Sequence, residues 1–165
     1  FQQLSPFRDT PGLKLIPPEG MHITLRFLGD VDGPKYRALI KMLKAFNPPV
    51  LPSKAEFSTI GRFPSSGRPS VLIAPIVRGS FEIENLYNAL SVCLLPFFPK
   101  EKRNFSPHIT LARVKDYTDI GILSQIMGIS FKGSIPIERI ILYKSELTSR
   151  GAVYTELAEI PLKTE

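Results

Sequence analysis

The sequence predicts an α+β domain with antiparallel sheets, and three observations lead to that prediction. Sixteen prolines and eleven glycines are spread along the 165 residues, which favours many short elements over a helical bundle. Helical spacing of apolar residues alternates along the chain with short strand-like runs. Most of these runs are joined by turn residues, as in hairpins. The length is that of one domain, so residues 1–165 are predicted to fold together.

The first elements are predicted to be two strands and a helix. Residues 13–16 and 21–29 are rich in apolar and β-branched side chains, and the Pro-Pro-Glu-Gly sequence at 17–20 is typical of a turn. A Gly-Pro pair then begins a helix over residues 33–46, which carries apolar residues at helical spacing. The Asn-Pro-Pro sequence at 47–49 is expected to end that helix.

The middle of the chain predicts a hairpin followed by a second helix. Residues 55–62 and 70–77 are expected to pair around the Pro- and Gly-rich loop at 63–69. Ser80 is a suitable N-cap for a helix that extends to about Leu95 and presents one apolar stripe.

The last third of the chain predicts a strand, a short helix and three further strands. Residues 107–114 form the strand. Asp116 and Asp119 are placed to cap a helix that ends near Met127, although Gly121 weakens it. The final strands are expected over residues 131–135, 137–145 and 152–160.

Composition and charge exclude several classes of protein. The longest apolar stretches are far shorter than the ~20 residues that span a bilayer, and residues 1–14 show no signal peptide. The single cysteine, Cys93, excludes an internal disulfide and a cysteine-based zinc site, and fits a reducing compartment. The formal net charge of +6 is compatible with a nucleic acid or another phosphorylated partner, and equally with a solvated basic surface.

One tetrapeptide occurs twice in the sequence. His-Ile-Thr-Leu stands at residues 22–25 and again at residues 108–111, each time after a turn. The chain has only two histidines, and each belongs to one copy. A duplicated lobe with a two-fold pseudo-axis would bring the two strands face to face.

Each copy of the motif places its polar side chains on one face of a strand. Alternate residues of a strand share a face and lie about 6.5–7 Å apart. His22 therefore shares a face with Thr24 and Arg26, and His108 shares a face with Thr110. The opposite face is predicted to pack into the core and carries Ile23, Leu25 and Phe27 in the first copy.

These side chains provide the chemical groups needed to cleave a phosphodiester without a metal ion. A neutral imidazole can take a proton from water while an imidazolium protonates the leaving oxygen. The threonine hydroxyls and the arginine can donate to the non-bridging oxygens of the phosphate. A zinc site would need three or four ligands, and neither a Gly-x-Ser-x-Gly nucleophile motif nor a glycine-rich phosphate loop is present. No metal and no cofactor are therefore expected.

The two motifs and their neighbours resemble the two-histidine phosphoesterase superfamily, and within it the RNA 2′,3′-cyclic phosphodiesterases once called 2′-5′ RNA ligases. Residues 22–30 are similar to the first family motif, and residues 105–114 to the second. Residues 61–64 with 68–72 resemble the central hairpin. The closing hairpin is similar to residues 142–147 with 151–154. Members of the superfamily usually have a strand and a helix before the first motif. In this sequence that first strand is expected to be absent or to lie upstream of Phe1.

The resemblance implies a fold, an activity and a set of site residues. The fold would be two pseudo-symmetric lobes around a central cleft, each lobe an antiparallel sheet backed by helices. The activity would be metal-independent opening of an RNA-terminal 2′,3′-cyclic phosphate to a 2′-phosphate, carried out by a cytoplasmic monomer on substrates such as tRNA halves. The implied catalytic residues are His22 and His108, and the implied phosphate-binding residues are Thr24, Thr110 and Arg113. Arg26 is added as a substrate-binding residue because it shares the face of His22, and Phe105 is a candidate for contact with a base or, equally, for a residue of the core or wall. With strict alternation, Arg113 would lie on the face of the strand opposite to His108. A role for Arg113 in contacting the phosphate therefore requires strand twist or a bulge.

Two other functions remain open on the sequence alone. A basic sheet with aromatic side chains can also hold single-stranded RNA without catalysis. Joining 2′-5′ RNA ends is the same reaction in reverse at the same site. The resemblance assigns His22 as the acid and His108 as the base, but the two tetrapeptides are identical and do not distinguish these roles.

Overall fold

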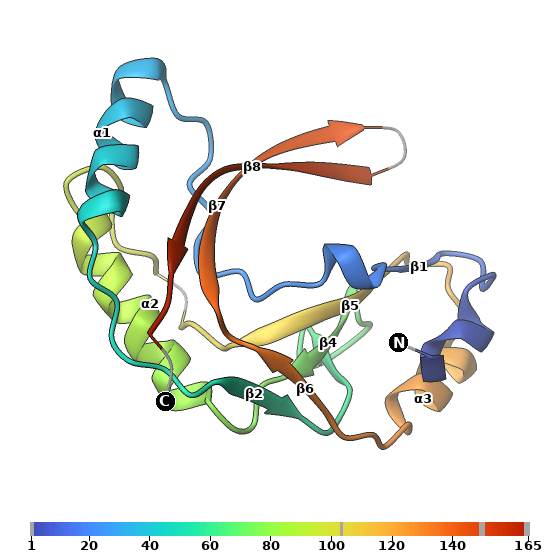
Figure 1. The fold of residues 1–165 in the computed structure, drawn as a ribbon. Helices are drawn as coiled ribbons and strands as arrows, with labels where there is room; N and C mark the ends of the chain where they lie inside the picture. Colours follow the sequence, from blue (N-terminus) through green and yellow to red (C-terminus); the bar gives the residue numbers. More distant parts are fainter. Residues whose placement is uncertain (1, 103, 149–150, 164–165) are drawn as a thin grey trace. The chain divides into compact units, whose positions relative to one another are not determined.

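The structure, a computed structural model, describes residues 2–102, 104–148 and 151–163. It confirms the α+β class, because the four-stranded sheet and the long hairpin are antiparallel and helices alternate with strands along the chain (Figure 1). The chain divides into two compact units. The first unit contains Phe1–Arg26, Ala55–Ser80 and Phe105–Ile135, and the second contains Phe27–Lys54, Phe81–Asn104 and Pro136–Glu165.

A four-stranded sheet is the framework of the first unit. Its strands lie in the order β1-β5-β4-β3. Their bounds are Leu13–Leu15 for β1, His108–Val114 for β5, Val71–Pro75 for β4 and Gly61–Phe63 for β3. The long strand β5 therefore has β1 on one edge and β4 on the other.

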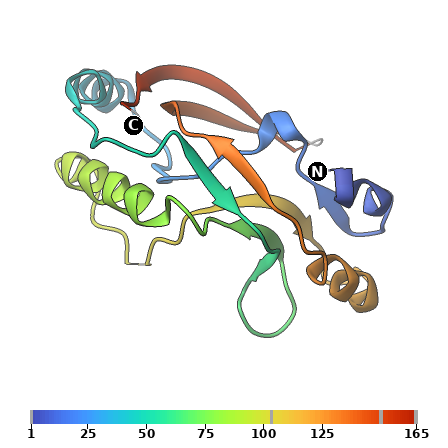
Figure 2. The ribbon, with the colours of Figure 1, turned by 60° about the horizontal axis from the view of Figure 1, so that its bottom comes forward.

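Shorter elements surround this sheet in the first unit. Strands β2 (Lys54–Phe57) and β6 (Gly133–Pro136) run side by side, as Figure 2 shows. Two 3-10 helices, η1 (Gln2–Phe7) and η2 (Pro18–Gly20), lie near the amino end. Helix α3 (Ile120–Met127) begins at the predicted cap, where the side chain of Asp119 accepts a hydrogen bond from the backbone amide of Ile122 at 2.9 Å.

One face of the four-stranded sheet is the core of the first unit. In β5 the side chains on this face are almost completely buried, because a half-buried strand turns every second side chain inward, and in β4 three consecutive residues are buried. The buried side chains of these strands and of β1 are Leu13, Leu72, Ile73, Ala74, Ile109, Leu111, Ala112 and Val114. An apolar cavity of about 70 Å³ remains behind β5, lined in part by Ile109, Leu111 and Leu4. The opposite face of β5 is left for polar side chains.

The second unit contains two helices and a long hairpin. Helix α1 (Gly33–Ala45) is capped by Asp32 and contacts strand β8 (Gly151–Pro161), which pairs with β7 (Arg139–Thr148). Helix α2 (Ser80–Leu94) buries four residues of the predicted apolar stripe, Ile83, Leu86, Leu90 and Leu94, and its fifth residue, Tyr87, is half-buried. Within the described residues, no helix has the length and hydropathy needed to cross a membrane.

The prediction of a strand over residues 21–29 is wrong. In the structure this segment has no regular strand, and Ile23 alone forms an isolated bridge. A strand is stable only where a neighbouring strand forms hydrogen bonds with its backbone N–H and C=O groups. In this segment no hydrogen-bonded ladder continues beyond the bridge at Ile23. Phe27, expected on the core face, is 79% exposed for the same reason.

The prediction of one strand over residues 55–62 is also wrong. The segment divides into β2 and β3, and these two strands enter different sheets. Only β3 forms the expected hairpin with β4, in which Gly61 pairs with Ile73 and Phe63 pairs with Val71. Strand β2 pairs instead with β6, which is far away in sequence and could not be identified as its partner from local pattern.

Candidate active site

Strand β5 positions the second copy of the tetrapeptide. Ile109 and Leu111 point into the core and are 2% and 6% exposed, while His108 and Thr110 are half-buried on the other face. This is the arrangement that alternation predicts for a strand with one packed face. We call the face of β5 that carries His108 and Thr110 the polar face.

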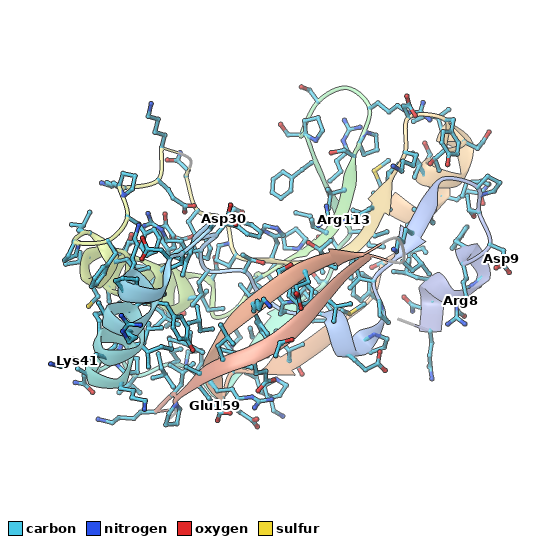
Figure 3. All side chains as sticks on the ribbon, turned by 90° about the horizontal axis from the view of Figure 1, so that it is seen from above. Arg8, Asp9, Asp30, Lys41, Arg113 and Glu159 are labelled. Carbon is cyan, nitrogen blue, oxygen red and sulfur yellow. The ribbon has the colours of Figure 1, made fainter. Side chains whose placement is uncertain are left out.

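A β-bulge brings Arg113 onto the polar face. Successive residues of β4 pair with Thr110 and Ala112, so Leu111 is an extra residue on β5. Leu111 and Ala112 are both buried, and Arg113 is exposed. The bulge resets the alternation, so that Arg113 shares the face of His108 and Thr110; Figure 3 labels Arg113 on this strand. The irregularity that the resemblance required is thus present in the strand.

The first copy of the tetrapeptide lies along the edge of β5 that faces away from β4, next to the part of that edge that pairs with β1. Ile23 forms an antiparallel bridge with Ile109, and Ile109 also pairs with Ala74 of β4. Because β4 occupies one edge, Ile23 lies on the edge that β1 also uses. Both copies of the motif therefore belong to the first unit.

The bridge places the polar residues of the two copies next to one another. Its antiparallel register sets His22 opposite Thr110 and Thr24 opposite His108. Side chains directly opposite each other have Cβ atoms about 4.5–5.5 Å apart, and diagonal neighbours such as the two histidines about 7–8 Å. The two copies meet edge to edge within one unit, rather than on two strands that face each other from separate lobes.

Both imidazoles are held by the same contact. Nδ1 of His22 lies 2.9 Å from the carbonyl oxygen of Gly20, and Nδ1 of His108 lies 2.6 Å from that of Ser106. A carbonyl oxygen only accepts, so Nδ1 carries the proton and donates in both residues. The proton that is gained or lost is then the one on Nε2, which is the requirement for a general acid or base.

Phe63 is a site residue that the sequence analysis missed. Its ring meets the imidazole of His108 edge to face, with a centroid separation of 5.0 Å, and its side chain is 38% exposed. Phe63 ends β3, before a cis peptide bond to Pro64. The hairpin was identified by its resemblance, but local pattern does not show that β3 brings an aromatic ring to β5.

Arg26 and Phe105 lie outside the strands. Arg26 is half-buried, three residues after the bridge, and its Nε and Nη1 atoms are shielded from solvent. Phe105 is half-buried in the segment that leads into β5. Their roles in substrate binding stay predictions.

Metal-binding groups do not gather around the histidines. Among the residues that the structure describes, no three His, Cys, Asp or Glu side chains come together in a manner that could hold an ion. The chemical groups on the polar face are imidazoles, hydroxyls and a guanidinium.

Comparison with known proteins assigns the chain to a family. The model of the LigT-like phosphoesterases matches residues 1–73 and 79–154. An RNA 2′,3′-cyclic phosphodiesterase of Aquifex aeolicus is 33% identical over 156 residues, which cover 90% of this chain and 81% of that protein. The enzyme of the same name from Thermus thermophilus is 31% identical over 175 residues, covering 99% of this chain and 81% of that protein.

Solved structures show the same fold. A crystal structure of a protein from Thermus thermophilus matches with a TM-score of 0.81 and 27% identity, covering 99% of this chain and 90% of that one. LigT of Escherichia coli, crystallised with 3′-AMP, matches with a TM-score of 0.68 and 22% identity, covering 98% and 90% of the two chains. From the family match, the relatives and the shared fold, the chain belongs to the LigT-like phosphoesterase family.

Proposed function

We propose that this chain hydrolyses the 2′,3′-cyclic phosphate at the end of an RNA to a 2′-phosphate, without a metal ion. The observation that carries the proposal is the antiparallel bridge between Ile23 and Ile109. Its register supports a site in which two imidazoles and two threonine hydroxyls share one surface. Relatives about one-third identical to this chain are named RNA 2′,3′-cyclic phosphodiesterases, which supports this choice of substrate.

The reaction needs one base and one acid. The base, a neutral imidazole, takes a proton from water through Nε2 while the water oxygen forms a bond to phosphorus. The bond between phosphorus and the 3′-oxygen breaks, and the other histidine, protonated on Nε2, gives its proton to that oxygen. The products are a 2′-phosphate and a 3′-hydroxyl. We assign His22 as the acid and His108 as the base, following the resemblance.

The threonines and arginines would stabilise the charge on phosphorus. Each threonine lies directly opposite a histidine of the other copy, so a phosphate between the imidazoles lies within reach of both hydroxyls. Arg113 shares this face and adds a charge-assisted contact, and Arg26 is proposed as a second cation. Transition-state charge would then be met by fixed donors instead of by Mg²⁺.

The proposed partner is an RNA end rather than a membrane or a protein. The net charge of +6 favours a polyanion, and Phe105 is proposed to contact the terminal base. Ends such as those of tRNA halves have the required chemistry. With a single cysteine, the chain is suited to a reducing compartment, and we propose that it acts in the cytoplasm as a monomer.

The test removes Nε2 while keeping the contact through Nδ1. In His22→Asn and His108→Asn the amide nitrogen can still donate to the carbonyl that Nδ1 now contacts, so the local structure has its hydrogen bond. Each variant should lower kcat on a trinucleotide that ends in a 2′,3′-cyclic phosphate by about 10²–10⁴-fold. Full turnover in both variants would overturn catalysis by these residues and leave a non-catalytic RNA-binding module. Joined RNA ends at meaningful yield would favour ligation instead.

A further inference from the structure

The loop between β3 and β4 is folded around one guanidinium. Arg62 donates from Nη1 to the carbonyl oxygen of Gly67 at 2.8 Å and from Nη2 to that of Ser65 at 3.1 Å. The carbonyl oxygen of Phe63 accepts two hydrogen bonds from Ser70, one from its backbone amide at 2.8 Å and one from its hydroxyl at 3.2 Å. Most of the loop is exposed, so these hydrogen bonds help to fix its shape.

The far end of the same loop has an anchor of its own. Arg68 donates to the carbonyl oxygen of Thr118, a buried residue that precedes α3, and Pro69 is buried. The two ends are therefore held by different arginines, and Arg62 holds the end next to Phe63.

Arg62 lies on the face of the sheet opposite to the polar face. Residues that are directly opposite in a sheet project to the same face. Arg62 pairs with Leu72, which is 1% exposed in the core, whereas Phe63 pairs with Val71, the partner of Arg113. Arg62 can therefore influence the polar face only through other residues.

Phe63 is the residue through which Arg62 can act. Strand β3 has three residues and stands at the edge of the described four-stranded sheet, where β4 is its neighbour. The ends of such short edge strands open easily, because few backbone hydrogen bonds hold them. From the end of β3, the Phe63 ring reaches across β4 to meet the His108 imidazole on β5.

We propose that Arg62 is a positioning residue: it folds the loop at the end of β3 and thereby holds the Phe63 ring against His108. A planar guanidinium can donate to two carbonyl oxygens at once, and a lysine ammonium lacks this fork. The proposal rests on the proposed function in one respect, because Arg62 affects the rate only if His108 takes part in the reaction.

The kinetic experiment compares Arg62→Lys with a matched control. Arg78→Lys makes the same exchange at an exposed arginine of the same unit, which contacts Glu56 at 3.3 Å. On a trinucleotide that ends in a 2′,3′-cyclic phosphate, Arg62→Lys should lower kcat by about twofold to twelvefold, the range expected for loss of the aromatic contact. KM and its salt dependence should stay unchanged, because the charge is kept. Arg78→Lys should stay within about twofold of the wild type.

A double-mutant cycle tests whether Arg62 acts through the ring. The variant that combines Arg62→Lys with Phe63→Ala should be no slower than Phe63→Ala alone, because the group that Arg62 positions is already gone. Losses that multiply in the double variant would overturn the proposal. A rise in KM that depends on salt would also overturn it, since Arg62 would then bind the RNA. So would an unchanged kcat with a lower free energy of unfolding, which is the result of a purely structural role.

A measurement on the imidazoles tests the proposal apart from activity. The chain has two histidines, so the ring C–H resonances of His108 can be assigned by NMR, with those of His22 as the internal reference. The nearby Phe63 ring shifts the His108 resonances. Arg62→Lys should move them in the same direction as Phe63→Ala does, and Arg78→Lys should not. Unmoved resonances in Arg62→Lys would overturn the positioning role and leave the proposed function standing. An inactive wild type with the expected NMR shifts would instead overturn the proposed function, and with it the effect of Arg62 on the rate.

Discussion

Ile23 bridges Ile109 in antiparallel register, and this one contact makes the two copies of the tetrapeptide neighbours. An antiparallel pair of strands has a local two-fold axis between the strands. The two copies of His-Ile-Thr-Leu, one on each side of the bridge, are related by this axis. His22 faces Thr110 as His108 faces Thr24. The same symmetry extends to the two Nδ1 contacts, each of which reaches the carbonyl two residues earlier. The backbone contacts of the two histidines are therefore alike, and His108 in addition meets the ring of Phe63.

Ile109→Ala should destabilise the first unit because Ile109 supports the bridge from the buried face. Its side chain is 2% exposed and lines the cavity behind β5, so truncation enlarges an existing cavity. The free energy of unfolding should fall by about 2–4 kcal/mol in urea denaturation. Ile120→Ala is the matched control, because Ile120 is 53% exposed at the start of α3 and should lose less than about 1 kcal/mol. Equal losses in the two variants would show that Ile109 does not support the sheet.

The part of the site that sequence analysis predicted is the part that depends on local pattern. Alternation along β5 placed His108 and Thr110 together. The requirement for strand twist or a bulge before Arg113 followed from the same alternation once the family resemblance had given Arg113 a role, and the structure has a bulge there. The α+β class followed from the mixture of helical and strand-like spacing in the same way. These features are encoded by neighbours in the chain.

The features that the sequence analysis missed all depend on residues far apart in the chain. Phe63 contacts His108 because the hairpin lays β3 beyond β4, and no pattern within β3 shows this. The first motif was predicted as a long strand, but its pairing is confined to Ile23. The alternation of polar and apolar residues in a sequence indicates which side chains share a face of a strand. A hydrogen-bonded ladder also requires a partner strand along the full length of that strand.

Phe63→Ala should lower kcat and leave KM nearly unchanged. The ring edge restricts the orientation of the His108 imidazole, and an aromatic contact of this kind is worth about 0.5–1.5 kcal/mol, or about twofold to twelvefold in rate. Phe63→Tyr keeps the ring and should keep most of the rate. Phe81→Ala, at a site that is 70% exposed on α2, is the control for loss of a surface aromatic. If Phe63→Ala raises KM in a way that depends on the terminal base, the ring contacts the nucleobase instead of positioning His108.

Chelation should leave the reaction unchanged. In the part of the chain that the structure describes, no third ligand joins the two histidines, and two imidazoles alone would bind zinc too weakly for catalysis. The proposed site supplies its own acid, base and cation. Hydrolysis of a 2′,3′-cyclic nucleotide should therefore proceed at the same rate after dialysis against EDTA. A metal-dependent phosphodiesterase treated in parallel serves as the control for effective chelation. A strong loss of activity that a divalent cation restores would show that the metal-free mechanism is wrong.

The pH dependence of the rate should be bell-shaped, because one histidine must be neutral and the other protonated at the same time. In the proposed mechanism the two imidazoles share one phosphate, so each limb of the profile is expected to belong to the coupled pair and not to a single residue. The profile alone cannot assign the acid, since the two histidines belong to identical tetrapeptides and make the same Nδ1 contact. The assignment needs a substrate that makes one of them unnecessary.

A phosphodiester with a good leaving group in place of the 3′-oxygen no longer needs the acid. Loss of the acid should then be largely rescued, whereas loss of the base should not, because water still has to be deprotonated. With His22 as the acid, His22→Asn should regain most of its rate on this substrate and lose the limb of the pH profile at which the acid deprotonates. His108→Asn should stay inactive on both substrates. Rescue of His108→Asn alone would reverse the assignment, and rescue of neither variant would contradict acid–base catalysis by this pair.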